Sequence, residues 1–392
     1  MRYIDVAIVG GGVAGAAAGA MLGRAGIGAV VIDPHKVYPP DFRCEKLDGG
    51  QVALLRKTGL DDVVLPVSTP DQEVWLARFG RLVDKKPHDQ IDILYDTLVN
   101  TLRAAIPAPA EFLHAKVANI VTSGERQTIT LSNGEEISAR LVILATGLNA
   151  ALRRSLGIER KELSPCHSIS IGFDIAPVGR PAFEFHAMTY FPERAGDRMA
   201  YLTMFPIHDT MRANYFVYRD MRDPWLQKLR SEPVAAINAA LPRLSRITGA
   251  VAIPGPVDIR PVDLYAVTGY RQAGVVLVGD AFCTSCPAAG TGVSKVFTDV
   301  ERLCHVHIPQ WLATPGMGAE KIGAFYDDPV KRACDEESAA RAYFLRSLST
   351  DEGAKWRLRR WARFAGHLGL GVLRGLRERS SAPARLQTAA GR

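Results

Sequence analysis

The amino-acid sequence predicts an α/β fold with three parts: a Rossmann-like βαβ unit at the N-terminus, an antiparallel β-sheet in the middle of the chain, and a helical segment at the C-terminus. Three observations predict it. A glycine-rich turn joins two apolar runs near the N-terminus, apolar and polar residues alternate through residues 168–220, and residues 355–392 are rich in arginine. With 392 residues, the chain is long enough for two domains.

The N-terminal unit has the glycine spacing of a dinucleotide-binding motif. Residues 3–9 form an apolar run, a helix of small residues follows the turn, and a second apolar run ends at Asp33. In the turn, Gly10 allows a sharp bend, Gly12 lets the backbone approach a pyrophosphate, and Gly15 lets helix and strand pack closely. Asp33 stands at the spacing of an acid that accepts a hydrogen bond from a ribose hydroxyl. The unit therefore predicts a dinucleotide site.

The middle of the chain alternates between helical and strand patterns. They predict a helix at residues 51–57, a hairpin at 72–84, a helix at 92–105 and three strands within 115–146. Residues 168–220 predict further strands, which we expect to form an antiparallel sheet with one solvated face.

A second glycine-rich segment, VLVGDAFCTSCPAAGTGVSK, follows this sheet. Its apolar strand stops at Gly279 and Asp280, and a helix pattern begins at Gly292. The pair Cys283 and Cys286 lies in the turn between them. With one CxxC pair and no histidine pair at ligand spacing, the sequence predicts no metal site.

The positive charge of the chain is concentrated at one end. The net charge is +7, but residues 355–392 contain ten basic residues and one acid, a net +9, which leaves about −2 for the rest. A nucleic-acid-binding protein would carry such charge across a folded face, so we expect no nucleic-acid partner. No long apolar run and no signal peptide are present, so we expect a cytoplasmic protein. The basic segment at residues 355–379 is either a helix packed on the body or a peripheral membrane contact.

Together these motifs resemble the FAD-dependent class A flavoprotein monooxygenases of the para-hydroxybenzoate hydroxylase type, over roughly residues 3–345. The resemblance rests on three places: GGGVAG with Asp33, the pair Arg43-x-Glu45 before the run LLRKTGL, and the segment from Tyr270-Arg271 to Gly292.

The resemblance implies FAD as the cofactor and assigns residues to it. In the family, a Gly-Asp carboxylate binds the ribityl chain, and the glycine-rich turn after it lies against the flavin ring. The corresponding residues here are Asp280 and the turn from Pro287 to Gly292. The implied cofactor-binding residues are Gly10, Gly12, Gly15, Asp33, Arg43, Gly147, Gly279, Asp280, Pro287, Gly290 and Gly292. The implied domains are an FAD-binding domain (1–70, 90–165 and 269–345), a substrate β-sheet domain (71–89 and 166–268) and a basic helical segment (346–392).

The sequence also departs from the family pattern. Thr146 stands where the family has an aspartate, and Cys283 where it commonly has a histidine. Only one dinucleotide fingerprint is present, so NAD(P)H, the expected electron donor, either binds transiently at the surface or acts through a separate flavin reductase.

The thiols leave three readings open. Cys44, Cys283 and Cys286 are candidates for contact with the flavin, Cys286 or Cys283 by a covalent link in one reading. The CxxC pair is alternatively a redox pair, or all three are packing residues.

The expected activity is hydroxylation of an aromatic or polyketide-like small molecule through a flavin hydroperoxide. Such chemistry needs a base near a substrate hydroxyl, and Tyr201 and His186 on the middle sheet are our first candidates. The alternatives are a reductase or dehydrogenase of the geranylgeranyl-reductase kind and a flavin-dependent halogenase, whose Trp-x-Trp-x-Ile-Pro signature is absent.

Overall fold

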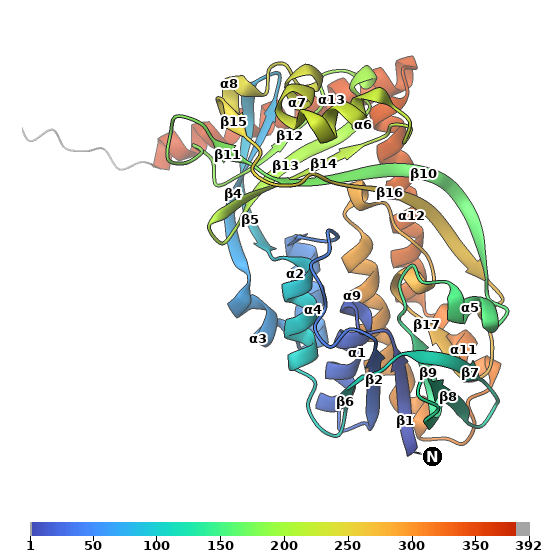
Figure 1. Cartoon of the computed structure of the whole chain (residues 1–392). Helices are drawn as coiled ribbons and strands as arrows, with labels where there is room; N and C mark the ends of the chain where they lie inside the picture. Colours follow the sequence, from blue (N-terminus) through green and yellow to red (C-terminus); the bar gives the residue numbers. More distant parts are fainter. Residues whose placement is uncertain (1, 382–392) are drawn as a thin grey trace, which may run out of the picture.

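The structure, a computed structural model, describes residues 2–381 and consists of two layers that lie one above the other in Figure 1. The lower layer contains a seven-stranded sheet in which parallel strands are ordered β6-β2-β1-β9, with β17 also beside β9 and an antiparallel extension through β8 and β7. Its strands are β1 Arg2–Val9, β2 Ala29–Asp33, β6 Glu111–His114, β7 Val117–Val121, β8 Gln127–Leu131, β9 Glu136–Leu144 and β17 Val275–Leu277.

The upper layer is an eight-stranded sheet in the order β16-β10-β14-β13-β12-β4-β5-β3. Neighbouring strands are antiparallel except β12 and β4, which pair in parallel. Its strands are β3 Lys46–Leu47, β4 Thr69–Arg78, β5 Arg81–Asp92, β10 Glu159–Asp174, β12 Ala187–Tyr190, β13 Met199–Ile207, β14 Thr210–Val217 and β16 Asp258–Thr268; β11 Ala176–Pro177 and β15 Val251–Ala252 form a separate small pair.

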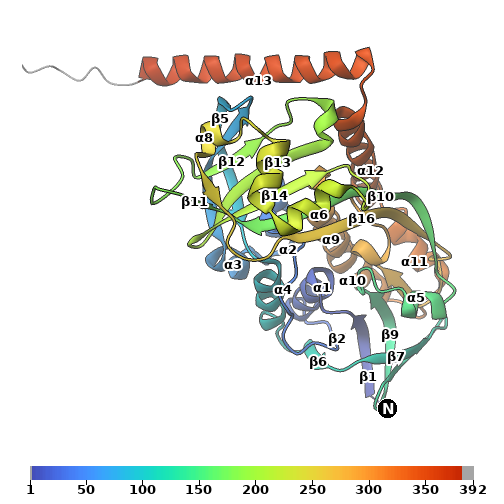
Figure 2. The same cartoon turned by 45° about the horizontal axis from the view of Figure 1, so that its top comes forward.

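Helices cover both layers and connect them. The α-helices are α1 Val13–Arg24, α2 Gly49–Thr58, α3 Asp61–Val64, α4 Tyr95–Ala104, α5 Ala151–Ser155, α6 Pro224–Ser231, α7 Pro233–Ala240, α8 Ser245–Thr248, α9 Gly292–Arg302, α10 Ile308–Leu312, α11 Ala319–Tyr326, α12 Pro329–Thr350 and α13 Ala354–Ser381. Helix α12 extends from the lower layer to the upper one, and α13 lies as a long rod across the upper layer (Figure 2). The predicted α/β fold with a C-terminal helix is confirmed.

The first turn has the geometry that its glycines predicted. Gly10 has φ +100°, and a Cβ atom there would lie 2.5 Å from the carbonyl oxygen of Ala145. A Cβ atom on Gly15 would lie 1.8 Å from the carbonyl oxygen of Gly10. Helix α1 can therefore cross β1 only because this position has no side chain.

Helix α2 is defined at both ends by local chemistry. Asp48 accepts a hydrogen bond from the backbone N–H of Gln51, at 2.9 Å, and the Gln51 side chain accepts one from the backbone N–H of Asp48, at 3.0 Å. This capping box begins the helix, and Gly59, in the left-handed conformation, ends it. The box also fixes the orientation of Gln51, which matters for the site below.

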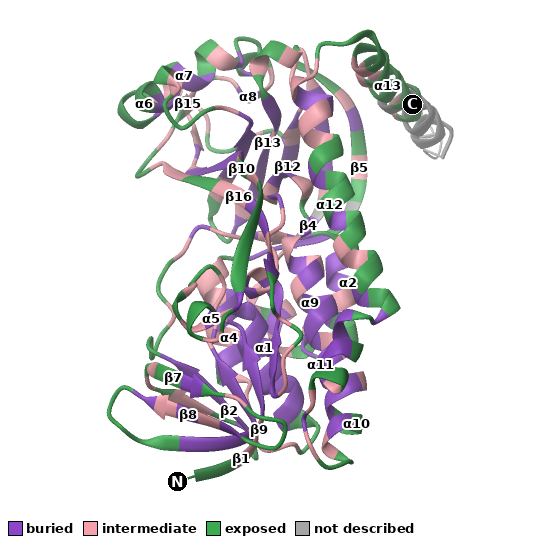
Figure 3. Cartoon of the chain, turned by 90° about the vertical axis from the view of Figure 1, so that its right-hand side faces the viewer, coloured by how far each residue is buried: buried purple, intermediate pink, exposed green. Residues whose placement is uncertain are grey.

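The expectation of a solvated sheet face was wrong. The alternation is real, because Ile169, Ile171 and Phe173 pack in one cluster with Leu226 of α6 and Ile237 of α7. The opposite face carries buried polar side chains, including Ser168, Ser170, Thr203 and Asn214. Both faces of the central strands are buried (Figure 3), because the second face looks toward the other layer and not toward water.

Candidate active site

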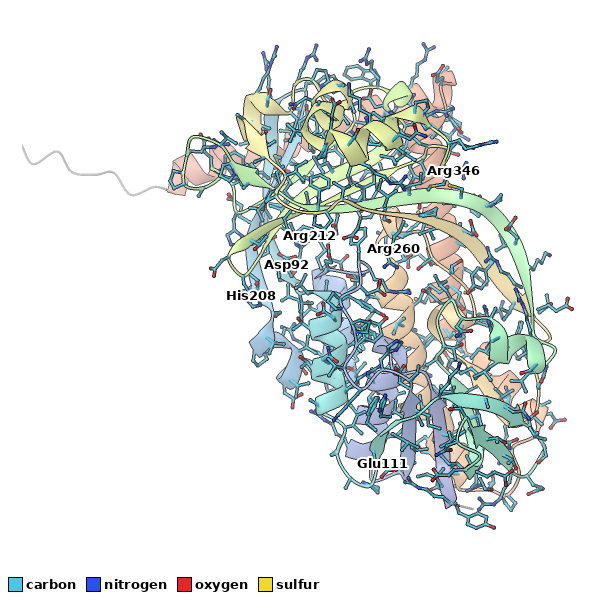
Figure 4. The ribbon with its side chains drawn as sticks, viewed as in Figure 1. Asp92, Glu111, His208, Arg212, Arg260 and Arg346 are labelled. Atoms are coloured by element: carbon cyan, nitrogen blue, oxygen red, sulfur yellow. The ribbon has the colours of Figure 1, made fainter. Side chains whose placement is uncertain are left out.

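A cavity of about 1070 Å³ lies between the two layers. Its floor is built by α1, the loop before β3, and the segment from Asp280 to Val296, and its roof by β10, β12, β13 and β14. Side chains from α12 and α13 complete one wall. Figure 4 shows Asp92, Arg212 and Arg260 lying in the space between the upper sheet and the helices below it.

The floor contains two helix N-termini that can hold an anion. Within the described residues, no side chain caps the start of α1 at Gly12 or of α9 at Gly292. The unpaired backbone N–H groups and the helix dipole therefore remain available to a ligand.

The acid at the end of β2 is held beside the first of these N-termini. Asp33 accepts hydrogen bonds from the backbone N–H groups of Gly11, at 2.7 Å, and His35, at 2.9 Å. Arg103 of α4 lies 3.1 Å from Asp33 and donates to the carbonyl oxygen of Gly11 at 2.7 Å. Only 5% of the Arg103 side chain is exposed, so it braces the turn from within.

The second acid, Asp280, lies at the end of β17 and lines the cavity. Its carboxylate is 3.6 Å from the guanidinium of Arg43. About 35% of the Asp280 side chain is exposed, but that surface faces the cavity, and burial raises the pKa of its carboxyl group while Arg43 opposes the shift.

A buried charge network supports the turn that carries Asp280. The backbone N–H of Gly279 donates to Asp299 at 2.8 Å, and Lys331 of α12 donates to the other oxygen of Asp299 at 2.8 Å. Although burial opposes its charge, the carboxylates of Asp299 and Asp335 raise the pKa of Lys331. The turn is thus tied to α9 and to α12 together.

The turn after Cys286 lies directly under the roof. It forms a short 3₁₀ helix, Pro287–Ala289, and Gly290 ends it in the left-handed conformation. Gln51 donates to the carbonyl oxygen of Gly290 at 2.7 Å, and the Tyr201 hydroxyl donates to that of Ala288 at 2.8 Å. One bond comes from the lower layer and one from the upper sheet, so both layers position this turn.

The roof and wall combine apolar side chains with the arginines Arg78, Arg260, Arg341, Arg360 and Arg363 and with a few buried polar atoms. Ser170 Oγ and Asn214 Oδ1 are buried and have no hydrogen-bond partner within the described part of the chain. The apolar lining includes Phe42, Phe191, Phe216, Phe344, Leu345, Leu348 and Phe364. An apolar pocket with few unpaired polar groups is typical of a small-molecule site.

The structure brings part of the predicted site together around this cavity. Arg43, Cys44, Tyr201, Asp280, Pro287, Gly290 and Gly292 line it. The other six predicted cofactor-binding residues lie outside the lining: Gly10, Gly12 and Gly147 in turns, Gly15 in α1, Asp33 at the end of β2 and Gly279 in the turn after β17. His186 is outside the lining, with 49% of its side chain exposed and its Nδ1 atom 2.8 Å from Asp71. Glu45, the second residue of the Arg-x-Glu motif, pairs with Arg212 of β14 at 3.0 Å.

The three candidate thiols have different surroundings. Cys44 lines the cavity and donates to the carbonyl oxygen of Lys46, and burial raises its pKa to about 12. Cys283 Sγ lies 2.6 Å from Lys295 Nζ, and the buried Cys286 lies 3.5 Å from Ser168 Oγ. Burial raises the pKa of both thiols, and none of the three is in a disulfide. Their contact with the flavin stays a prediction.

Three functional positions were missed by sequence reasoning: Arg103, Gln51 and Lys46. Arg103 is separated from the turn that it braces by about 90 residues, so no local pattern connects them. Gln51 could have been found, because Asp-x-x-Gln is a capping-box signal that directs its side chain. Lys46 lines the cavity from β3, a strand too short to leave a sequence pattern.

The comparisons with known proteins decide which ligand this floor serves. Residues 3–306 match the family described as FAD binding domain. The chain belongs to this family. The flavoprotein is 28% identical over 324 residues to 3-demethoxyubiquinol 3-hydroxylase of Escherichia coli (strain K12), covering 77% of this chain and 79% of that protein.

Two solved structures show the same fold at lower identity. One is p-nitrophenol 4-monooxygenase PnpA from Pseudomonas putida DLL-E4, with a TM-score of 0.73, 16% identity and 95% of each chain covered. The other is the flavin-dependent brominase Bmp2, with a TM-score of 0.67, 18% identity and 93% and 94% of the two chains covered.

The residues in the site fit FAD. The uncapped start of α1 would hold the pyrophosphate, Asp33 and Asp280 would accept hydrogen bonds from the ribose and the ribityl chain, and the uncapped start of α9 would lie near the flavin ring. The protein is an FAD-dependent oxidoreductase of the class A flavoprotein monooxygenase type, as the three sequence motifs predicted.

Proposed function

We propose that this flavoprotein hydroxylates an electron-rich aromatic or polyketide-like molecule bound in the cavity between the two layers. The carrying observation is the cavity itself: it joins the turn at Pro287–Ala289 to an apolar roof with a few unpaired polar atoms. Bound FAD would supply the oxygen chemistry, and the chain would bind the substrate, orient it and exclude water.

The relatives support an aromatic substrate. The similar Escherichia coli protein is a hydroxylase of demethoxyubiquinol, and PnpA is a monooxygenase of p-nitrophenol. The brominase shows that the fold also serves halogenation, so the fold by itself does not choose between the two.

The electron donor is NAD(P)H, used directly or through a separate flavin reductase.

A single-turnover experiment tests the oxygen chemistry whichever electron donor is used. The holoenzyme is reduced anaerobically with dithionite and mixed with O2 and a panel of phenols, with and without an alkyl chain. We expect a hydroxylated product whose new oxygen comes from 18O2. Product formed without O2 would overturn the proposal in favour of a reductase, and brominated product with added bromide would indicate a halogenase.

We further propose that α13 places the protein at an anionic membrane surface. Its half-buried positions, Trp356, Arg360, Phe364 and Gly371, turn toward the body, where Arg360 donates to two carbonyl oxygens at the end of α12. The exposed apolar side chains of this helix include Leu358, Trp361, Ala362, Ala365, Leu368 and Leu370. Lys355, Arg357 and Arg359 flank them. A basic helix with an exposed apolar face binds the interface of anionic bilayers.

None of the helices within residues 2–381 is long and apolar enough to cross a bilayer, so the proposed contact is peripheral. Leu358 and Trp361 are 71% and 58% exposed. Replacing both with Gln should lower binding to vesicles of phosphatidylglycerol and phosphatidylethanolamine at least about tenfold, because each apolar side chain contributes roughly 1.5–3 kcal/mol when it is buried.

Vesicle co-sedimentation of the holoenzyme measures this change. The matched control is Val121→Gln, which replaces another exposed apolar residue, on β7, and should bind like the wild type. If the wild type does not bind these vesicles, or the double variant binds equally well, the membrane proposal is wrong.

A further inference from the structure

Lys46 is a half-buried amine that lines the cavity and has few partners. It lies on β3, lines the cavity, and donates one hydrogen bond, to Thr203 Oγ1 at 3.1 Å. Its Nζ atom is 5.4 Å from the centre of the Phe205 ring. Among the described residues, no ion pair within 4 Å includes Lys46; the carboxylates of Asp92, Asp71 and Asp48 act on it only through their charge. Two of its three N–H positions are therefore free to meet a ligand.

Across the strand pair stands a buried acid that is also incompletely satisfied. Asp92 is opposite Lys46 in the β3–β5 register and is fully buried. One of its oxygens accepts from Gln90 at 2.8 Å, and the other has no hydrogen-bond partner among the described residues. Gln90 also donates to Asp71 at 3.2 Å, and Asp71 holds His186.

Burial favours the uncharged forms of both Lys46 and Asp92. Burial lowers the pKa of Lys46, while Asp92 on β5, Asp71 on β4, and the neighbouring Asp48 and Cys44 oppose the shift. Burial raises the pKa of Asp92 to about 8, and Lys46 opposes that shift. Two interacting groups with pKa values moved toward neutral pH are typical of acid–base sites.

The residues first considered for this role fit it less well. The Tyr201 hydroxyl already donates to Ala288, and burial raises its pKa, so the phenol keeps its own proton and cannot take one from a substrate. His186 lies outside the cavity lining. Lys46 both lines the cavity and has hydrogen-bonding positions that no other described residue occupies, and neither Tyr201 nor His186 meets both conditions.

We infer that Lys46 is the residue that accepts the proton of a substrate hydroxyl and then holds the oxyanion, and that Asp92 is a positioning residue for it. This inference rests on the proposed hydroxylation. The substrate O–H bond breaks, its electron pair stays on oxygen, and the proton forms an N–H bond on the neutral amine of Lys46. The resulting oxyanion makes the ring more electron-rich. When the product forms, the ammonium group returns the proton to the product oxygen, which regenerates the amine.

The inference assigns a substrate class. The molecule should carry an ionisable hydroxyl group on its aromatic or enolic ring, placed toward β3, because the two free N–H positions of Lys46 recognise an oxyanion there. A ring without such a hydroxyl group would cover the half-buried amine and leave it unpaired, which costs binding free energy.

The first test does not depend on turnover. The holoenzyme is treated with 2,4-dinitrofluorobenzene, an aromatic reagent that loses fluoride to neutral amines, over a range of pH, and each lysine is followed by peptide mass spectrometry. Lys46 should react with a midpoint at least about one pH unit below that of the exposed Lys161. Asp92→Asn should move that midpoint lower still, since the Asp92 charge raises the Lys46 pKa. A midpoint for Lys46 at or above that of Lys161, or no labelling of Lys46, would overturn the inference.

The second test separates proton transfer from a structural role. Lys46→Met should lower kcat/KM for 4-methylphenol by about 10²-fold or more, and that for 4-nitrophenol, which is ionised at the assay pH, by less than about tenfold. Lys46→Arg, which keeps a charge but cannot accept a proton, should also fail with 4-methylphenol. Equal losses with both phenols at unchanged FAD content would contradict the role, and Lys161→Met should match the wild type. If the wild type hydroxylates no phenol, the proposed function fails and the labelling result still decides the state of Lys46.

Discussion

Lys331→Met should unfold this flavoprotein at a markedly lower temperature and weaken its hold on FAD. Lys331 and Asp299 are 1% and 2% exposed and lie 2.8 Å apart. Removing the ammonium group leaves Asp299 as a buried, uncompensated charge, which costs about 3–5 kcal/mol. For a chain of this size, we expect a fall in Tm of about 4–6 °C. Because Asp299 also receives the N–H of Gly279, the turn that carries Asp280 should loosen, and the bound fraction of FAD should fall.

Calorimetry of the holoenzyme and flavin absorbance after gel filtration measure these two effects. The matched control is Arg332→Met on the same helix, whose pair with Glu336 is 61% and 72% exposed. An exposed pair of this kind contributes little, so its Tm should stay within about 2 °C of the wild type. A similar Tm for both variants would show that the buried network does not support the fold.

Gly15→Val should abolish FAD binding. Even the Cβ atom would lie 1.8 Å from the Gly10 carbonyl oxygen and 3.3 Å from the Ala145 side chain, so α1 must move away from β1. The helix start would then leave its place beside Asp33, and the anion site would be lost. We expect the purified variant to retain less than about a tenth of the wild-type flavin.

Flavin content per chain, measured by absorbance, decides this prediction. Gly124→Ala is the control, since a Cβ atom there meets no atom within 4 Å. A Gly15→Val chain that carries stoichiometric FAD would show that α1 does not hold the cofactor. Far-UV circular dichroism separates loss of FAD from loss of the fold.

Local sequence patterns were reliable wherever one stretch of chain carried all of the information. The turn at Gly10, the strand that ends at Asp33 and the segment at Asp280 could be predicted because each combines a strand, a glycine bend and a helix in continuous order. The direction of α2 and of Gln51 could have been predicted from the capping box, since that signal spans only four residues.

Residues far apart in sequence could not be paired in this way. Arg103 reaches the first turn from α4, and Glu45 meets Arg212 of β14, because the sheets fold back on each other. The prediction of a solvated sheet face failed for the same reason. The alternation of apolar and polar residues shows that a strand has two different faces. It does not show whether the polar face contacts water or a second layer of the protein.

The sequence by itself determined the family and the cofactor, and it predicted the floor of the site, since the turns and helix starts that would hold FAD are encoded by neighbouring glycines, prolines and acids. Only the tertiary structure decided what faces the substrate. It placed His186 outside the cavity, Tyr201 over the turn, and Lys46 opposite Asp92. Such side chains depend on the burial and charge that distant strands create around them, and these physical conditions exist only after the two layers have packed together.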